Sequence, residues 1–236
     1  MQALDTLHGT AALVTGASRG LGRALAIALG RAGARVVLVA RGADALSAAR
    51  DEVAATGADA HAITADVGDA DAAFEVVRRA TALVGPLDLV INNASVLGPT
   101  PLAPLLDTDA GDLERVLPVN LVGPFVISKH AAASMALRGR GTIVNISSDA
   151  AVAAYPTWGS YSVSKAALDH LTRIWAAELS DSGVTVLSID PGEMDTVMHA
   201  AAIPEADPAT LSAPDDVAQA ILELLIQPKE PSQTRF

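Results

Sequence analysis

A tyrosine and a lysine stand four residues apart in the segment Tyr161-Ser162-Val163-Ser164-Lys165. On a helix, this spacing places the phenol and the ammonium group on one face. An ordinary tyrosine has a pKa of about 10, so acid–base work at neutral pH needs a fall of about 3 units, or roughly 4 kcal/mol. One ammonium group at about 4 Å supplies that order of energy at an effective dielectric constant of about 20. The pair predicts a tyrosine that exchanges protons with a substrate, whereas the alternative is an ordinary helix start with a solvated lysine.

A serine upstream strengthens the prediction that Tyr161 exchanges protons with a substrate. Ser148 follows the apolar run Thr142 to Ser147, which we predict to be a strand. Open α/β sheets bind ligands beyond the carboxyl ends of their strands, so Ser148 is expected to face a substrate. Ser162-Val163-Ser164-Lys165 also matches the S-x-x-K motif of penicillin-interacting enzymes. The accompanying S-D-N and K-T-G motifs are absent from the sequence, so we discard that interpretation.

A glycine-rich segment follows the first predicted strand and opens the first predicted helix. It reads Thr15-Gly16-Ala17-Ser18-Arg19-Gly20-Leu21-Gly22. Glycines here permit a tight turn and the close approach of a pyrophosphate to backbone N–H groups at a helix N-terminus. The residues Gly16 to Gly20 also match the G-x-S-x-G nucleophile elbow of serine hydrolases. That elbow lies mid-sheet and needs an acid and then a histidine in a recognisable context; none of the histidines provides one, and the hydrolase remains the minor alternative.

Two arginines indicate which dinucleotide would bind. An acidic residue about 20 positions beyond the glycine-rich loop would hold the 2′-hydroxyl of NAD. The second predicted strand instead ends at Ala40 and is followed by Arg41, and Arg19 stands in the loop itself. Each charge-assisted hydrogen bond to a 2′-phosphate contributes about 1.5–3 kcal/mol. The cations favour NADP(H), whereas in the alternative both arginines are solvated surface residues.

The elements that must position these groups alternate between strands and helices. Apolar runs of strand length are Thr10 to Thr15, Arg35 to Ala40, Ala60 to Ala65, Leu87 to Asn92, Thr142 to Ser147 and Val184 to Asp190. Segments with a period near 3.6 residues are Leu21 to Ala32, Ala43 to Thr56, Asp69 to Leu83, Asp112 to Leu137 and Tyr161 to Ser180. This order predicts an α/β fold with a doubly wound parallel sheet of the Rossmann type, six to seven strands and helices on both faces. Pro118 should kink the fourth helix just before Asn120, and Pro124 should add a second break.

Composition limits the class of protein. The chain has 236 residues, no cysteine and a formal net charge of −11. The absence of cysteine excludes a disulfide framework and sulfur-based zinc sites, and we predict no metal site. The acidic balance argues against nucleic acid and anionic membranes as partners. No linker or repeat divides residues 1–236, which we predict to form one domain, and the first residues carry no signal-peptide pattern, which predicts a cytoplasmic location.

The glycine-rich segment Thr15 to Gly22, Ser148 and the Tyr161–Lys165 pair resemble motifs of the short-chain dehydrogenase/reductase family, in its compact single-domain branch. The resemblance runs from about Thr10 to Gln227 and keeps the family's order and spacing. It implies a catalytic set of Asn120, Ser148, Tyr161 and Lys165. With Arg41 added from the argument above, the predicted cofactor-binding residues are Gly16, Ser18, Arg19, Gly20, Leu21, Gly22, Arg41, Asp66, Val67, Asn93, Ala94, Tyr161, Lys165, Pro191, Gly192 and Thr196.

The resemblance also implies a mechanism. A hydride would pass between C4 of NADP(H) and a carbonyl or alcohol carbon, with Tyr161 donating the proton in reduction and Ser148 binding the substrate oxygen. Lys165 would lower the pKa of Tyr161 and hold the nicotinamide ribose, and Asn120 would anchor a water that relays protons. The alternative is a non-catalytic dinucleotide-binding regulator, against which the intact catalytic set argues.

Departures from the family pattern qualify these expectations. Ser95 replaces the usual glycine after Asn-Asn-Ala. The segment from Thr196 to Leu211 is short, which predicts a small or open lid over the substrate. Gln233 to Phe236 would form only a stub of a seventh strand. That stub puts in doubt the tetramer contacts that such a strand supports, so a homodimer or homotetramer is expected, with a dimer face on the helices 112–137 and 161–180.

The substrate side of the site is expected to be apolar. Its predicted walls are Val96 and Leu97, Ala150 to Trp158 and Glu193 to Ala202, which offer Tyr155, Trp158, Met194 and Met198 with little charge. They favour a small apolar or aromatic ketone or aldehyde, or a 3-oxoacyl compound. The sequence does not separate these from a sugar or a steroid.

Overall fold

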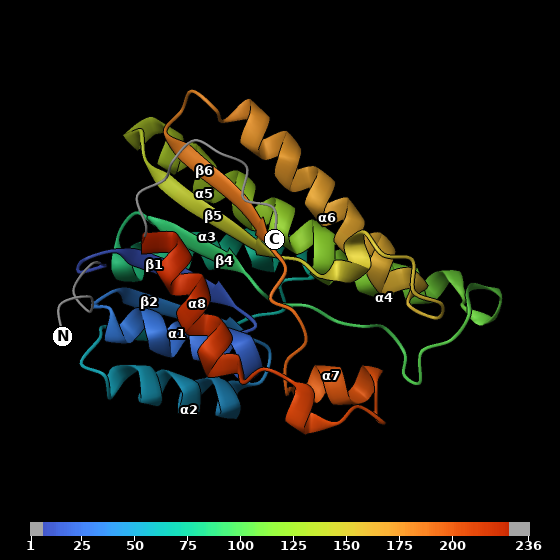
Figure 1. Ribbon diagram of the computed structural model, residues 1–236. Coiled ribbons are helices and arrows are strands. Elements are labelled where there is room, and N and C mark those ends of the chain that lie inside the picture. Colours follow the sequence, from blue (N-terminus) through green and yellow to red (C-terminus); the bar gives the residue numbers. More distant parts are fainter. Residues whose placement is uncertain (1–6, 227–236) are drawn as a thin grey trace.

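A six-stranded parallel sheet forms the centre of the computed structural model, which describes residues 7–226 (Figure 1). The strands are β1 (Ala11–Thr15), β2 (Arg35–Ala40), β3 (Ala60–Thr64), β4 (Leu89–Asn92), β5 (Gly141–Ile146) and β6 (Val184–Ile189). Their order is β3-β2-β1-β4-β5-β6, and every neighbouring pair is parallel. The order reverses between β1 and β4, which is where a doubly wound sheet opens a crevice for a ligand. The predicted fold class is confirmed.

The helices connect the strands and cover both faces. They are α1 (Gly20–Arg31), α2 (Ala43–Ala54), α3 (Ala70–Val84), α4 (Ala110–Leu117), α5 (Gly123–Arg138), α6 (Gly159–Glu178), α7 (Val197–Ala202) and α8 (Pro214–Ile226). The sequence pattern predicts α1, α2, α3 and α6 to within two residues of these bounds. It does not predict α7 or α8, which follow the last strand. The predicted stub of a seventh strand, residues 233–236, lies outside the described residues.

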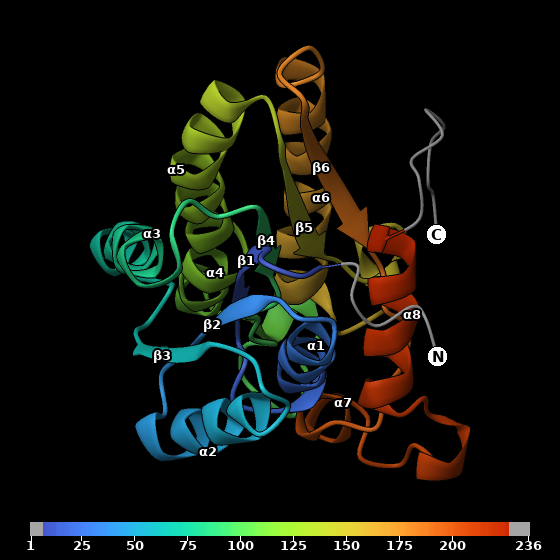
Figure 2. The same cartoon turned by 90° about the vertical axis from the view of Figure 1, so that its left-hand side faces the viewer.

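Alternate strand residues feed two separate core layers. In β1, Ala12 and Val14 pack with α1, α2 and α8, whereas Ala11 and Leu13 pack with α3, α5 and α6. Figure 2 shows α1 and α8 on one side of the sheet and α3 and α5 on the other. Parallel strands buried on both faces read as continuous apolar runs, which is why the strands are visible in the sequence.

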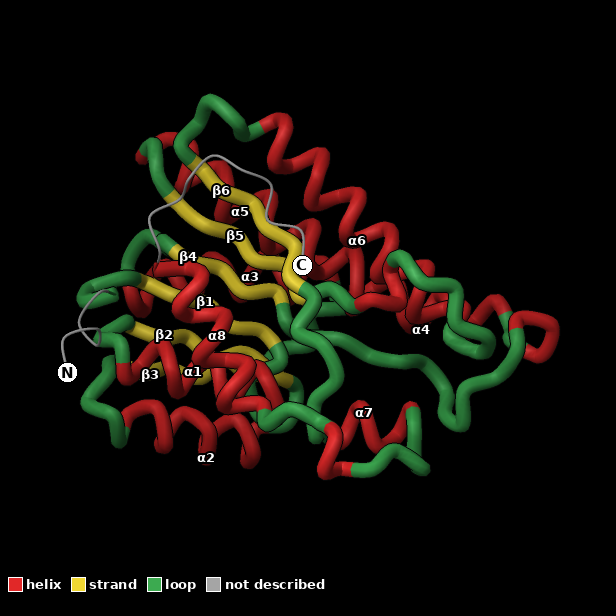
Figure 3. Tube along the Cα trace, in the orientation of Figure 1, coloured by secondary structure: helices red, strands yellow, loops and turns green. Residues whose placement is uncertain are grey.

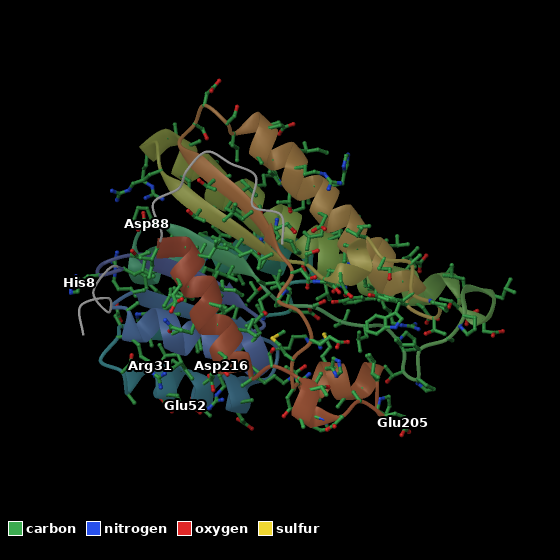
Figure 4. All side chains as sticks on the ribbon, in the orientation of Figure 1. His8, Arg31, Glu52, Asp88, Glu205 and Asp216 are labelled. Carbon is green, nitrogen blue, oxygen red and sulfur yellow. The ribbon has the colours of Figure 1, made fainter. Side chains whose placement is uncertain are left out.

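A polar cluster around Asp88 connects the amino end of β1 to α5. The carboxylate of Asp88 accepts a hydrogen bond from the backbone N–H of Ala11 at 3.2 Å and pairs with Arg138 at 2.7 Å. Figure 4 shows Asp88 at the side of the sheet away from α7. Charged side chains that stabilise the sheet therefore lie at the end opposite the carboxyl ends of the strands, where ligands bind in this fold.

The long helix that begins at Ala110 changes its winding in the middle. Residues Pro118–Val122 form a π-helical turn between α4 and α5. Pro118, predicted to kink the helix, is the first residue of this π-helical turn, whereas Pro124 adds no separate break because it lies in the first turn of α5, where a missing N–H costs little. The wider turn buries Asn120 completely. π-turns are rare and are frequent at functional sites.

The run 110–138 is long and apolar enough to cross a membrane by length and composition alone. Core helices of globular proteins meet the same criterion. Here Ile127, Ala131 and Met135 are buried in the second core layer.

The face predicted for dimer contact keeps apolar side chains in solvent. Phe125 on α5 and Val163 and Ile174 on α6 are 39%, 52% and 43% exposed. Phe125 also stacks on Trp175 with ring centroids 6.1 Å apart. The dimer itself stays a prediction.

Candidate active site

A cavity of about 1110 Å³ opens at the carboxyl ends of the strands. Loops after all six strands contribute to its wall, together with residues of α6 and α7; Figure 3 shows these loops and the long connection between β4 and α4. The predicted residues that line it are Gly16, Ser18, Arg19, Gly20, Leu21, Arg41, Asp66, Val67, Asn93, Ala94, Ser148, Tyr161, Lys165, Pro191, Gly192 and Thr196. Gly22 and Asn120 lie behind the wall. The structure thus brings the predicted cofactor and catalytic groups to one place.

The glycine-rich turn is tied to the loop after β4. The Asn93 side-chain amide donates to the carbonyl of Thr15 at 2.9 Å, and the Thr15 hydroxyl accepts from the N–H groups of Asn93 and Ala94, each at 3.0 Å. Gly16 has φ +66°, and a Cβ there would stand 2.8 Å from the Cα of Ala94. Only glycine fits this left-handed and crowded position. Asn93 therefore shapes the turn that a dinucleotide would contact.

The start of α1 fits a pyrophosphate. Within the described structure, its N-cap residue Arg19 makes no side-chain bond to the helix, and its first turn contains no acidic residue. The free N–H groups and the helix dipole favour an anion there, and Gly16 and Gly20, which line the cavity, present no side chain between the anion and the backbone. These residues, with Arg41 beyond β2, are the ones that would hold a nicotinamide dinucleotide.

Gly22 offers a test of this close packing. A Cβ at Gly22 would lie 2.4 Å from the Asn93 amide nitrogen and 2.4 Å from the Gly16 carbonyl oxygen. We expect Gly22→Ala to lower the free energy of unfolding by about 1–3 kcal/mol and to weaken binding of a nicotinamide dinucleotide at least about tenfold, because the turn and the β4 loop must separate. Urea unfolding and calorimetric titration measure both effects. Gly111→Ala is the matched control, since a Cβ there meets only the Arg115 side chain at 3.6 Å; equal behaviour of the two variants would contradict the packing argument.

Arg41 has a carboxylate neighbour that the sequence argument does not foresee. Asp66, which follows β3, lies 3.9 Å from the Arg41 guanidinium, and both side chains are largely exposed. An exposed pair at this distance contributes little to stability, so Arg41 remains free to bind an anion. No carboxylate follows β2 itself, as the sequence indicates, but strand pairing places the end of β3, and with it Asp66, next to the end of β2.

Tyr161 and Lys165 lie on one face of α6, as their spacing predicts. Both are buried, and the Lys165 Nζ lies 5.6 Å from the centroid of the Tyr161 ring. The ammonium group donates to the backbone carbonyl of Ile146 at the end of β5, at 2.7 Å. This bond anchors the lysine between the helix and the sheet, beside the position of Ser148.

Burial dominates the titration of this pair. Desolvation raises the pKa of Tyr161 to about 12, with Asp190 and Asp149 adding to the rise and the hydroxyls of Ser148 and Ser95 opposing it. Desolvation also lowers the pKa of Lys165 to about 8. The expected fall of the Tyr161 pKa is therefore not seen, because the desolvation of the phenolate outweighs one ammonium group whose Nζ lies 5.6 Å from the ring centroid.

The hydroxyl of Ser148 is held by the residue that follows it. Ser148 Oγ donates to Asp149 Oδ1 at 3.0 Å and accepts from the N–H of Ala150 at 3.2 Å. The other carboxylate oxygen of Asp149 accepts from the Tyr155 hydroxyl at 2.7 Å. Asp149 thus orients Ser148, and the hydroxyl must turn away from it to donate to a substrate oxygen.

Asn120 is fully bonded to protein groups. Its Nδ2 donates to the Val96 carbonyl and to Ser164 Oγ, each at 2.9 Å. Its Oδ1 accepts from the N–H of Val96 at 2.9 Å and from Ser95 Oγ at 3.2 Å. These four bonds use both amide hydrogens and both acceptor positions, so the side chain cannot also anchor the predicted relay water. Its visible role is to hold the β4 loop against α6.

A family model described as short chain dehydrogenase matches residues 10–207. The chain belongs to the short-chain dehydrogenase family. Among its relatives, a versicolorin reductase of Emericella nidulans is 37% identical over 193 residues, covering 81% of this chain and 72% of that protein. A gluconate 5-dehydrogenase of Gluconobacter oxydans is 37% identical over 195 residues, covering 83% and 75%. The crystal structure of a metagenomic short-chain oxidoreductase in complex with NADP superposes with a TM-score of 0.81 at 33% identity, covering 94% of this chain and 93% of that one.

The substrate end of this short-chain dehydrogenase combines apolar and charged groups. Leu97, Ala150 and Tyr161 form a buried cluster against which Trp158 and Met198 pack. The predicted scarcity of charge is wrong, because a group of acidic residues and one histidine also line the cavity, namely Asp149, Asp190, Glu193, Asp195 and His199. Asp149, Glu193 and Asp195 are exposed, whereas Asp190 is partly buried and both ring nitrogens of His199, on α7, are buried. Charged groups therefore lie inside the cavity as well as at its exposed rim, next to the apolar cluster around Tyr161.

Several residues at this dehydrogenase site are not predicted by the sequence analysis. Asp190 directly follows β6, and Asp149 comes after Ser147 and Ser148 beyond the end of β5, so a position beyond a strand end was the available signal for both. Ser95 was visible only as a departure from the family pattern. His199 of α7 lies 3.6 Å from Glu193, and a single sequence offers no signal that joins the two.

Proposed function

We propose that this short-chain dehydrogenase is an NADPH-dependent oxidoreductase that interconverts a carbonyl compound and an alcohol. The proposed substrate is a small apolar or aromatic ketone or aldehyde, or a 3-oxoacyl compound. The observation that carries the proposal is that Tyr161, Lys165 and Ser148 line the same cavity as the glycine-rich turn of α1. Groups able to transfer a proton therefore stand beside the place for a dinucleotide.

The residues of the chain divide the chemistry. A bound nicotinamide dinucleotide supplies the hydride in reduction and accepts it in oxidation. Tyr161 gives its phenolic proton to the substrate oxygen in reduction and takes it back in oxidation. Ser148 turns from Asp149 to donate to the same oxygen, where negative charge develops. Lys165 holds positive charge next to the phenol and stabilises its deprotonated form.

Both the chain and its relatives support the assignment. Arg19 and Arg41 line the cavity, and a 2′-phosphate would form charge-assisted bonds with them. The NADP-bound structural relative has 33% identity and a closely similar fold. The names of the reductase and the dehydrogenase above fit chemistry at C=O and CH–OH groups. A non-catalytic regulator has no physical need for the buried Lys165 ammonium beside Tyr161, which leaves that alternative without support.

Calorimetric titration with NADPH and NADH tests the cofactor. We expect NADPH to bind at least about tenfold more tightly, because one charge-assisted bond of about 1.5–3 kcal/mol corresponds to that factor or more. Arg41→Ala should weaken NADPH binding by about tenfold and leave NADH binding unchanged. Arg31→Ala, on the last turn of α1, is the control that removes an arginine far from the cavity (Figure 4). Equal affinity for NADPH and NADH in the wild-type protein would cancel the NADP assignment while leaving the oxidoreductase in place.

A further inference from the structure

Ser95 occupies a position with two polar neighbours in the active site. It follows β4 in the segment Asn92-Asn93-Ala94-Ser95 and lines the cavity together with Tyr161. Its Oγ donates to Asn120 Oδ1 at 3.2 Å. The glycine usual at this place in the family pattern has no side chain and could make no such bond.

The bond belongs to a chain of hydrogen bonds that reaches the backbone of Tyr161. Asn120 Nδ2 donates to Ser164 Oγ at 2.9 Å, and Ser164 Oγ donates to the backbone carbonyl of Tyr161 at 2.7 Å. Asn120 and Ser164 are both fully buried. The backbone of Tyr161 is thus linked to Asn120 through Ser164, and Ser95, bonded to the same asparagine, lines the cavity together with Tyr161 and lowers the pKa of its phenol.

We propose that Ser95 is a positioning residue whose hydroxyl connects Asn120 to the phenol of Tyr161 and stabilises the phenolate that forms during proton transfer. While Tyr161 is protonated, Ser95 donates to Asn120 Oδ1. When the phenol gives up its proton, the Ser95 hydroxyl turns and donates to the phenolate oxygen. The N–H of Val96 continues to donate to Asn120 Oδ1 at 2.9 Å, so this buried acceptor keeps a partner throughout the exchange.

The charged groups around Tyr161 make this donor valuable. Lys165, on α6 itself, is the cation beside the ring. Asp149 after β5 and Asp190 after β6 are anions that disfavour a phenolate. Ser148, the other hydroxyl that acts on the phenol, has its proton directed to Asp149 Oδ1. Ser95 is a neutral donor, and its present acceptor, Asn120 Oδ1, also receives a hydrogen bond from the N–H of Val96. The Ser95 hydroxyl lowers the pKa of Tyr161 and so opposes the effect of burial.

The chain provides a direct optical test. It contains only two tyrosines, Tyr155 and Tyr161, so in a Tyr155→Phe background the ultraviolet absorbance change of phenolate formation reports on Tyr161 alone. The full-length protein is titrated with pH, with saturating NADP⁺ and without it. We expect Ser95→Ala to raise the midpoint by about 0.5–1 pH unit, the shift that corresponds to losing a hydrogen bond of ordinary strength. Ser95→Thr, which keeps a hydroxyl, should restore the midpoint of the parent.

Ser162→Ala is the matched control. The Ser162 hydroxyl is buried one residue from Tyr161 and, within residues 7–226, has no hydrogen-bond partner, so its removal should not move the midpoint. An unchanged midpoint in Ser95→Ala, or an equal shift in Ser162→Ala, overturns the proposal.

Kinetics supply an independent readout that rests on the proposed oxidoreductase activity. Alcohol oxidation needs the phenolate and carbonyl reduction needs the phenol, so in Ser95→Ala both pH profiles of kcat/KM should move to higher pH by the same 0.5–1 unit or so. A purely structural role would lower the rate at every pH and leave the midpoints in place, which would also overturn the proposal. If no variant turns over any substrate, the function fails, whereas the absorbance titration still decides the role of Ser95.

Discussion

Replacing Tyr161 by phenylalanine should lower the rate of carbonyl reduction by about 10³-fold or more and leave NADPH affinity within about twofold. The rate falls because, in the proposed reaction, the phenol donates the proton to the substrate oxygen, and general acid catalysis contributes about 10²–10⁴-fold. The fold should be retained, since the ring packs edge-on against Trp158 with centroids 5.7 Å apart and phenylalanine keeps that contact. Steady-state kinetics with an aromatic ketone and calorimetric titration with NADPH measure the two effects.

Tyr155→Phe is the matched control for this experiment. Tyr155 also lines the cavity, but its hydroxyl is bonded to Asp149 and its side chain is exposed at the mouth. Its loss should change the rate far less than the loss of Tyr161. Turnover by Tyr161→Phe at a rate similar to that of the wild-type protein would show that the proton comes from another group.

Replacing Lys165 by methionine should lower turnover by about 10²-fold or more and make the cofactor-free protein more stable at neutral pH. Turnover falls because the phenolate loses the cation beside it. Stability rises because burial lowers the pKa of Lys165 from 10.5 to about 8, so the folded protein carries a charge that it solvates poorly. That shift corresponds to about 3 kcal/mol at pH below 8, where lysine is protonated in both states. The Ile146 carbonyl loses its donor in the variant, which costs about 1–3 kcal/mol, so the net gain at pH 7 should be about 1 kcal/mol.

The pH dependence separates this charge effect from simple repacking. Between pH 8 and 10.5 the unfolded chain binds the lysine proton more tightly than the folded chain, so this group makes the wild-type free energy of unfolding rise with pH in that window. Lys165→Met lacks this contribution, and its advantage at pH 7 should shrink and reverse by about pH 10. Urea unfolding without cofactor at both pH values tests this. A stability difference that stays constant from pH 7 to 10 would contradict the buried-charge argument.

The fold could be predicted from the sequence because its strands are buried on both faces. Val36 to Val39 and Leu13 to Val14 read as unbroken apolar runs, and each helix between them has a clear period. The family motifs likewise mark which loops face the cavity. α7 could not be predicted in this way, since it is only six residues long and none of its residues is buried, so no apolar stripe identifies it.

The chemistry of the site was harder to predict than its location. Spacing shows that Tyr161 and Lys165 share a helix face, but not how much water surrounds them, and desolvation decides the direction of both pKa shifts. The four bonds of Asn120 come from segments far apart in the chain and depend on how the β4 loop meets α6. Asp66 approaches Arg41 only through the pairing of β2 with β3.

The π-helical turn at Pro118–Val122 sets a rotational phase between two halves of one helix. A π-turn accommodates one residue more than an α-helical turn, and each residue of an α-helix advances the side chains by about 100°. Deleting one residue here to restore a regular α-helix would rotate α4 against α5 by about that angle. Either Asn120 would then leave its partners on α6 and the β4 loop, or Ile127 and Met135 would leave the core. The length of this turn therefore determines both the position of Asn120 in the active site and the packing of α5 on the sheet, and deleting a single residue would disturb one or the other.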